Sequence, residues 1–199
     1  MFIVQLVLGV LFNVLLFALC LFLPAGTLDW WRAWVYLGLE AAGTVITTVV
    51  IFRARPDLLR ERLQSPVQPG QPAADKLLTS LVLLDFAATL VAIPLDRFRW
   101  HLLPAPHPAV AALGLLLAAA GWILISLVFR ENAFAAPVVK VQAERHHTVI
   151  DTGVYRLVRH PMYLGAVLFL AGTALWLESY AAALFTLVMV ALLVVRIRY

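Results

Sequence analysis

The chain has 199 residues and a formal net charge of +4 at pH 7, with 63% hydrophobic and only 13% charged residues. Its mean hydropathy of +0.94 excludes an ordinary water-soluble domain and predicts an integral membrane protein. The basic residues flank apolar runs instead of forming a stripe with exposed aromatic residues, so nucleic acid is not an expected partner. Cys20 is the single cysteine, which excludes an internal disulfide and a multi-thiolate metal site, and we expect no metal.

Four apolar runs are long enough to cross a hydrocarbon core about 30 Å thick, which takes roughly 20 helical residues. These predicted helices cover residues 2–23, 30–52, 77–95 and 108–129. The first is expected to be a membrane helix and not a removable signal peptide, because it lacks a basic N-terminal region and is too long. The connections are too short to form a second core, so the sequence predicts a single integral membrane domain over residues 1–199 and leaves the oligomeric state open.

The apolar C-terminal region is interrupted only at Glu178 and Ser179. One straight helix through it would be roughly 50 Å long, which exceeds the thickness of a bilayer. We therefore predict a C-terminal helical hairpin with arms at residues 162–177 and 180–195. The predicted fold is an all-α polytopic membrane helix bundle of five or six membrane segments, with a polar loop over residues 130–160.

Basic residues are distributed unequally between the two sides of this predicted topology. Twelve lie on the side of both termini and of the polar loop, and three lie on the other side. The positive-inside rule therefore predicts that both termini and the polar loop are cytosolic. Trp30, Trp31, Trp34 and Trp100 fall at the opposite boundary, where tryptophan rings settle at headgroup depth. The twelve are Arg53, Arg55, Arg60, Arg62, Lys76, Arg130, Lys140, Arg145, Arg156, Arg159, Arg196 and Arg198; the three are Arg32, Arg97 and Arg99.

Two pairs of small residues spaced four apart are predicted to allow close helix packing. They are Gly38 with Ala42 in the second segment and Gly114 with Ala118 in the fourth. Small side chains let two helix backbones approach closely in a membrane bundle.

Two carboxylic acids, Glu40 and Asp85, fall inside predicted membrane helices. Ionisable residues at such positions are candidates for a polar cavity. A structural role, in which each side chain hydrogen-bonds a neighbouring helix, is the alternative for both.

The polar loop and the start of the next helix carry the residues best suited to chemistry. Pro161 fits the first turn of a helix, so Arg159 and His160 come directly before free backbone N–H groups that suit a carboxylate or phosphate. Tyr155 and Tyr163 could stack on an aromatic ring or face a sulfonium cation. The alternative is that these side chains anchor the protein to lipid headgroups, as Arg, His and Tyr at membrane boundaries commonly do.

The spacing of seven residues resembles the signature of the isoprenylcysteine carboxyl methyltransferase family and its phospholipid methyltransferase relatives. The matching residues are His147, Gly153, Tyr155, Arg159, His160, Pro161 and Tyr163, with weaker matches at Asn132 and Phe134. The resemblance implies S-adenosyl-L-methionine as cofactor, with Arg159 and Arg196 as the catalytic residues. The cofactor-binding residues that it implies are Gln142, His147, Thr148, Val149, Ile150, Tyr155, His160, Pro161, Met162 and Tyr163.

The resemblance also implies methyl transfer to a lipophilic acceptor that enters from among the membrane lipids. The carboxylate of an isoprenylated cysteine, a phospholipid amine and a small thiol are all possible acceptors. A nicotinamide-dependent membrane reductase is an alternative, because sterol reductases carry a similar Arg-His-Pro-x-Tyr run, and a non-enzymatic membrane scaffold is another.

The family pattern continues after the last helix with an Arg and then a pair of Glu residues. Arg196 matches that Arg, but the sequence stops at Tyr199, where the pair would be expected. Either the sequence is shortened there or this member lacks those carboxylates.

Overall fold

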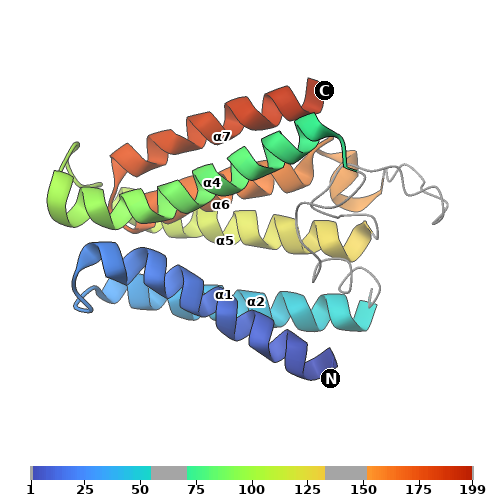
Figure 1. Cartoon of the computed structure of the whole chain (residues 1–199), viewed down its shortest axis with the longest axis horizontal. Coiled ribbons are helices and arrows are strands. Elements are labelled where there is room, and N and C mark those ends of the chain that lie inside the picture. Colours follow the sequence, from blue (N-terminus) through green and yellow to red (C-terminus); the bar gives the residue numbers. More distant parts are fainter. Residues whose placement is uncertain (1, 55–70, 133–151, 199) are drawn as a thin grey trace.

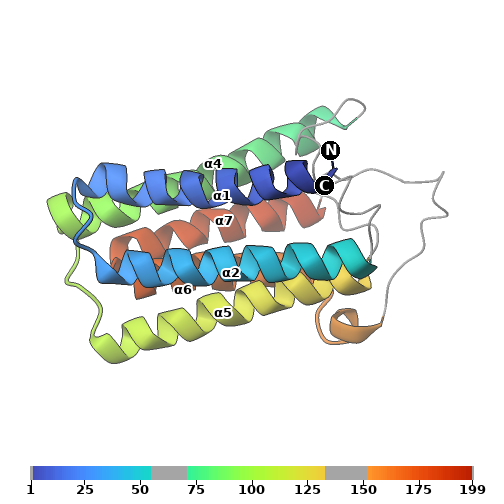
Figure 2. The ribbon, with the colours of Figure 1, turned by 90° about the horizontal axis from the view of Figure 1, so that it is seen from below.

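The computed structural model describes residues 2–54, 71–132 and 152–198, and these residues contain helices and no strand. Figures 1 and 2 show the long helices lying side by side as a bundle. The fold is therefore the predicted all-α polytopic bundle. In chain order the helices are α1 (Phe2–Ala25), α2 (Trp31–Ala54), α4 (Ala73–Leu95), the π-helical turn η1 (Asp96–Trp100), α5 (Pro108–Glu131), the 3-10 turn η3 (Gly153–Arg156), α6 (Pro161–Trp176) and α7 (Tyr180–Arg198).

Five helices in the described part of the chain are long and apolar enough to cross a membrane. They are α1, α2, α4 with η1, α5 and α7. The sixth apolar helix, α6, has only 16 residues and forms the predicted hairpin with α7. Many of their large apolar side chains are exposed on the outside of the bundle, as expected for helices surrounded by lipid.

Both chain termini lie at the same end of the bundle in Figures 1 and 2. The ends of α2 and α5 and the starts of α4 and α6 lie at that end as well. The turn between α1 and α2, the η1 turn and the α6–α7 turn lie at the other end. We call these the terminal end and the hairpin end of the bundle.

Helices α5 and α6 pack against each other through glycine. A Cβ atom added to Gly172 would lie 2.4 Å from the backbone nitrogen of Ala118, and one added to Gly114 would lie 2.8 Å from the Gly172 carbonyl oxygen. A Cβ atom added to Gly121 would lie 2.5 Å from the Gly165 carbonyl oxygen. The two backbones are therefore in direct contact along most of α6, and the predicted close approach at Gly114 and Ala118 is confirmed.

The prediction of a close helix contact at Gly38 and Ala42 is wrong. A Cβ atom added to Gly38 would meet no atom within 4 Å, and Ala42 is exposed. Close contact on α2 occurs instead at Gly43, where an added Cβ atom would lie 2.8 Å from the Trp122 indole nitrogen. Small residues four apart lie on one face of a helix, but their spacing does not show whether that face contacts a neighbouring helix.

Several predicted boundaries and surroundings also differ from the structure. Helix α4 begins at Ala73 and not at residue 77, which places Asp75 in its first turn. Arg196 and Arg198 are in the last turn of α7 and do not form a tail after it. Trp30 is buried, with its ring packed edge-on against Phe22 and Phe98, so it belongs to the core and not to an aromatic belt.

At the hairpin end, charged groups join the α6–α7 turn to two other helices. Glu178, in the left-handed backbone region with φ of 70°, pairs with Arg32 of α2 at 3.4 Å and with Arg97 of η1 at 3.1 Å. Arg32 also donates to the Trp176 carbonyl oxygen at 3.1 Å. Ser179 donates to buried Asp96 at 2.6 Å. These bonds hold the hairpin against the rest of the bundle.

Candidate functional site

The short turn η3 lies at the terminal end of the bundle and is held by the last residue of α5. The Glu131 carboxylate accepts a hydrogen bond from the Val154 backbone N–H at 2.9 Å. Gly153 has φ of +54°, and a Cβ atom there would lie 2.0 Å from both carboxylate oxygens of Glu131. Glycine suits this left-handed backbone, and a side chain here would force the Glu131 carboxylate to move. Gly153 of the motif therefore allows η3 to pack directly against Glu131 at the end of α5.

Tyr155, the motif tyrosine in η3, is half-buried against α5. Its hydroxyl oxygen accepts a hydrogen bond from the Asn132 side-chain amide at 2.8 Å. Burial raises the pKa of the Tyr155 phenol above its ordinary value, and the nearby Glu131 carboxylate raises it further, although the bond from Asn132 lowers it. Tyr155 therefore presents a neutral hydroxyl near physiological pH.

The start of α6 presents the Arg-His-Pro-x-Tyr run. Pro161 is the buried first residue of α6, as predicted, and Arg159 and His160 directly before it are exposed. The His160 and Tyr163 rings are stacked, with centroids 5.5 Å apart and planes at 12°. The first turn of α6 thus offers a pair of parallel rings beside an arginine. The predicted set of free N–H groups is wrong, because Pro161 has no N–H and those of Tyr163 and Leu164 donate to the His160 carbonyl oxygen at 3.1 and 3.2 Å.

Adjacent residues at the start of α6 face different neighbours. Met162 packs with Tyr155 against a cluster of Ile51, Val128 and Phe129, which we call the terminal cluster. Tyr163 packs on the other side, against the core that α6 forms with α4 and α7.

Arg196 lies at the end of α7 on the side that Tyr163 faces. Its guanidinium Nε donates to the Asp75 carboxylate of α4 at 2.8 Å, and both side chains are buried. The other oxygen of that carboxylate accepts a hydrogen bond from the Gln71 side chain. The charges of Asp75 and Arg196 are both close enough to act on the Tyr163 hydroxyl.

The structure places five of the predicted site residues in two groups around the start of α6. Tyr155 and Met162 meet in the terminal cluster, while His160, Tyr163 and Arg196 gather on the α4 and α7 side of the same helix start. Arg159 lies between the two groups in sequence and is exposed. The predicted residues outside the described part of the chain are Gln142, His147, Thr148, Val149 and Ile150.

Two residues that position the site were not predicted. Glu131 was read only as part of the polar loop, although its place beside Asn132, within the motif stretch, was a usable signal. Asp75 was assigned to a loop, and no local signal reveals its pairing with Arg196, which is 121 residues away. Among the described residues, no group of three His, Cys, Asp or Glu side chains could hold a metal ion.

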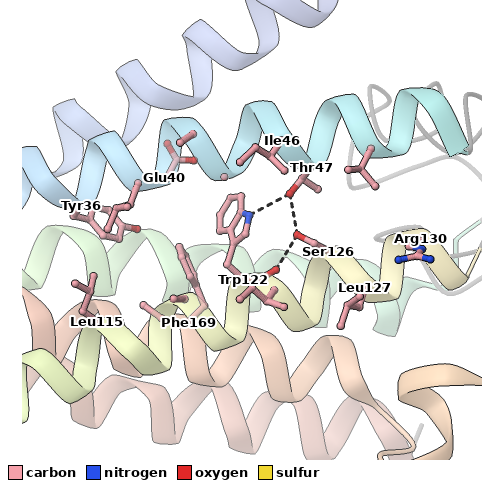
Figure 3. Close-up of a pocket in the computed structure, with 17 residues that line it drawn as sticks. Tyr36, Glu40, Ile46, Thr47, Leu115, Trp122, Ser126, Leu127, Arg130 and Phe169 are labelled. Atoms are coloured by element: carbon pink, nitrogen blue, oxygen red, sulfur yellow. Dashed lines mark hydrogen bonds between the residues drawn. The ribbon is translucent and has the colours of Figure 1, made fainter.

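A groove of about 470 Å³ runs between α2 and α5 (Figure 3). Its walls are mostly apolar, and several lining side chains, including Leu39, Ile46 and Ile123, are exposed on the outside of the bundle. The volume and the apolar lining suit an extended lipophilic ligand. The lining residues are Tyr36, Leu39, Glu40, Ala42, Gly43, Ile46, Thr47, Val50, Leu115, Ala118, Ala119, Trp122, Ile123, Ser126, Leu127, Arg130 and Phe169.

Polar bonds join the two walls of the groove near its middle. The Trp122 indole N–H donates to the Thr47 hydroxyl at 3.1 Å, and that hydroxyl lies 2.9 Å from the Ser126 hydroxyl. Figure 3 shows Tyr36 and Glu40 toward one end of the groove and Arg130 at the other. The Arg130 end lies at the same level along α2 and α5 as the terminal cluster, because Val50 precedes Ile51 and Arg130 follows Phe129.

Comparison with known proteins identifies relatives for the C-terminal part of the chain. Residues 109–199 match the family described as phospholipid methyltransferase. Two Arabidopsis thaliana proteins, protein-S-isoprenylcysteine O-methyltransferase A and B, are 28% and 27% identical over 105 and 103 residues. These matches cover 52% and 51% of this chain and 49% and 48% of the relatives, so the chain spans about half the length of the curated relatives it matches. No solved structure matches the chain. The resemblance expected from the motif is confirmed.

Proposed function

We propose, from the match of residues 109–199 to the phospholipid methyltransferase family, that the protein is a methyltransferase dependent on S-adenosyl-L-methionine. The acceptor that we propose is lipophilic and reaches the site from within the membrane. The match includes α5, η3, α6 and α7, and it covers every described residue that the sequence predicted for the site.

One observation supports this function above the others: the α2–α5 groove ends at the level of the terminal cluster, against which Tyr155 and Met162 pack. A lipophilic chain in the groove would hold its polar head near the start of α6. A methyl donor bound there would face that head, and holding both reactants in line supplies most of the catalysis that such a displacement needs. Soluble reactants would not require an open apolar groove of this kind.

The described residues fit the cofactor in chemical terms. S-adenosyl-L-methionine would supply the methyl group from its sulfonium. The stacked His160 and Tyr163 rings suit an adenine or a sulfonium, and the exposed Arg159 guanidinium suits the cofactor carboxylate. Gln142 and residues 147–150 complete the site that we propose.

Arg196 has a different proposed role from Arg159. Its ion pair with Asp75 holds the guanidinium beside Tyr163, where it would orient an anionic acceptor or cofactor group. A carboxylate acceptor needs no general base, because it is already the nucleophile. Among the acceptor classes, we therefore favour a carboxylate such as that of an isoprenylated cysteine, which the names of the two plant relatives also indicate.

We propose that the reaction occurs at the cytosolic face of the membrane. The terminal end of the bundle carries both termini and the candidate site, and the excess of Lys and Arg residues falls on the same side.

The test is transfer of a labelled methyl group from S-adenosyl-L-methionine to a panel of acceptors by the purified protein in detergent. The panel contains a prenylated cysteine, a phospholipid with a primary amine and a long-chain thiol. We expect transfer to at least one of them, and the Tm should rise with S-adenosylhomocysteine because a ligand of the native state stabilises it. Tyr163→Phe should reduce transfer, while Tyr180→Phe, at the hairpin end, serves as the matched control.

The same Tm measurement with NADPH separates the main alternatives. A rise with NADPH and none with S-adenosylhomocysteine would support a membrane reductase and contradict the proposal. No rise with either ligand and no transfer to any acceptor would support a non-enzymatic role.

A further inference from the structure

Glu40 of α2 places a carboxyl group in the wall of the α2–α5 groove, toward the end opposite Arg130 (Figure 3). The residue is 3% exposed, and its Oε1 accepts a hydrogen bond from the Thr44 hydroxyl at 2.8 Å. Its Oε2 has no hydrogen-bond partner among the described residues. The described part of the protein therefore satisfies only one of the two oxygens of this carboxyl group.

The part of the groove between Glu40 and the terminal end is well suited to a hydrocarbon chain. Its lining on α2 runs from Gly43 to Val50 and is mostly apolar. Three polar side chains on this stretch bond to one another: the Trp122 indole N–H donates to Thr47, whose hydroxyl lies 2.9 Å from that of Ser126. A chain that lies here covers no polar side chain that still needs a partner.

The carboxyl group of Glu40 opposes the binding of a longer chain. A hydrocarbon neither donates nor accepts a hydrogen bond, and a chain lying over Glu40 would also keep water away from Oε2. In either protonation state, Oε2 would then be buried without a partner, which is costly in an apolar environment. Binding should therefore be favourable up to the level of Glu40 and unfavourable beyond it.

The geometry of α2 sets the distance from the terminal end of the groove to Glu40. Val50 and Glu40 are ten residues apart, which at 1.5 Å per residue is about 15 Å. A fully extended peptide covers about 3.5 Å in three backbone bonds, so an isoprene unit, with four bonds along its chain, covers roughly 4.7 Å. An extended farnesyl chain of three units therefore spans about 14 Å and reaches the level of Glu40, whereas a geranylgeranyl chain of four units spans about 19 Å and passes it.

The fourth unit would have to lie against Glu40 and Tyr36, the last residue of α2 that lines this end of the groove. The Tyr36 ring packs against Phe169 of α6, with centroids 6.3 Å apart, and Tyr36 is 3% exposed. The longer chain would therefore meet both an unsatisfied carboxyl oxygen and a packed aromatic wall.

We propose that Glu40 is a specificity-determining residue that limits the isoprenyl chain of the acceptor to the length of a farnesyl group. The inference rests on the proposed function, which places the chain of an isoprenylated cysteine in the groove and its carboxylate at the terminal end. Glu40 would contact only the far end of the chain and would take no part in methyl transfer itself.

Binding of S-farnesyl-cysteine and S-geranylgeranyl-cysteine to the purified protein in detergent tests the proposal. Micelles take up the two ligands to different extents, so the measured quantity is the ratio of their Kd values in each variant compared with wild type. Glu40→Leu removes the carboxyl group and keeps a side chain of similar size. We expect this variant to shift the ratio about tenfold in favour of the geranylgeranyl ligand, the value of one buried polar group left unsatisfied. An unchanged ratio would overturn the proposal.

Two further variants show whether the effect comes from the carboxyl group in the groove. Glu40→Gln keeps a polar group at this position and should keep the wild-type ratio. Asp85→Leu is the matched control, because Asp85 is also a carboxylic acid within a membrane helix, with an unpartnered Oδ2 among the described residues, but it does not line the groove. A shift in Asp85→Leu as large as that in Glu40→Leu, or in Glu40→Gln, would contradict the proposal. The expected result is a gain of binding, which unfolding of a variant cannot produce.

The same samples separate this inference from the proposed function. Methyl transfer to a prenylated cysteine, with an unchanged Kd ratio in Glu40→Leu, would support the function and overturn the role of Glu40. A shifted ratio in Glu40→Leu without methyl transfer to any acceptor would contradict the proposed function and support Glu40 as the residue that limits chain length in the groove.

Discussion

Arg196, near the C-terminal end of α7, forms a buried ion pair with Asp75 in the first turn of α4, with its Nε and Nη2 atoms each 2.8 Å from the same carboxylate oxygen. The pair joins two helices at the terminal end of the bundle, next to Tyr163. It links the family-matched part of the chain to a helix that precedes it.

Replacing Asp75 with Asn should therefore affect both stability and activity. Arg196 would keep its charge in a buried position without this counterion, which costs about 3 kcal/mol or more when a buried pair loses one partner. We expect a lower Tm in detergent and a slower methyl transfer. A double-mutant cycle with Arg196→Gln measures the coupling, and the double variant should lose less than the sum of the two single losses. Additive losses would show that the pair does not act as a unit.

Gly153→Ala should weaken cofactor binding more than it weakens the fold. The added Cβ atom would collide with the Glu131 carboxylate, and the left-handed backbone at this residue disfavours alanine by roughly 1–2 kcal/mol. Either the Glu131 side chain would turn away and lose its bond to the Val154 N–H, or η3 would shift and move Tyr155 with it. The measurement is the Kd for S-adenosylhomocysteine, with Gly38→Ala as the control because a Cβ atom there meets nothing within 4 Å. An unchanged Kd in Gly153→Ala would show that η3 does not contribute to cofactor binding.

Gly172→Ala should be the most destabilising of the glycine substitutions. The new Cβ atom would lie 2.4 Å from the Ala118 backbone nitrogen, and backbone atoms cannot move aside as a flexible side chain can. Overpacking typically costs about 1–3 kcal/mol, so the Tm should fall clearly below those of wild type and Gly38→Ala. Because α6 would move away from α5, methyl transfer should fall as well. A wild-type Tm would mean that α5 and α6 are not in contact in the protein.

The pKa of Tyr155 predicts a loss of stability at alkaline pH. Its raised pKa means that the folded protein holds the phenol proton more tightly than the unfolded chain does. This stabilisation is fully present below the unfolded pKa of about 10 and disappears as the pH rises through the higher folded value. The Tm of wild type should therefore fall more steeply than that of Tyr155→Phe above about pH 10. Parallel curves for the two proteins would rule out a buried phenol at this position.

Glu178→Gln tests stability without touching the candidate site. The neutral amide would leave Arg32 and Arg97 without their shared carboxylate at the hairpin end, and we expect a loss of about 1–3 kcal/mol. The Kd for S-adenosylhomocysteine should stay at its wild-type value, because η3 and the start of α6, where we propose that the cofactor binds, lie at the terminal end. Weaker cofactor binding with an unchanged Tm would contradict both parts of this expectation.

Much of the architecture was readable from the sequence because it depends on local properties. Runs of apolar residues long enough to cross a bilayer predicted the helices, and their length limit predicted a turn at Glu178, which the structure confirms. Pro161 marked the start of α6 since its fixed φ and missing N–H suit that position. The motif spacing indicated the family for the same reason, as its residues lie within one short stretch of chain.

The lateral contacts between the helices could be identified only from the tertiary structure. Helices that are apolar on every side carry no stripe to mark the face that meets a neighbour, so Gly38 and Gly114 were equivalent in sequence and differ completely in packing. The pairing of Asp75 with Arg196 and the groove beside Glu40 likewise join residues from separate helices. Sequence alone determined which segments are membrane helices and where the motif lies. The three-dimensional packing decided which of their polar residues meet, because in lipid the partner of a helix is chosen by shape and not by hydrophobicity.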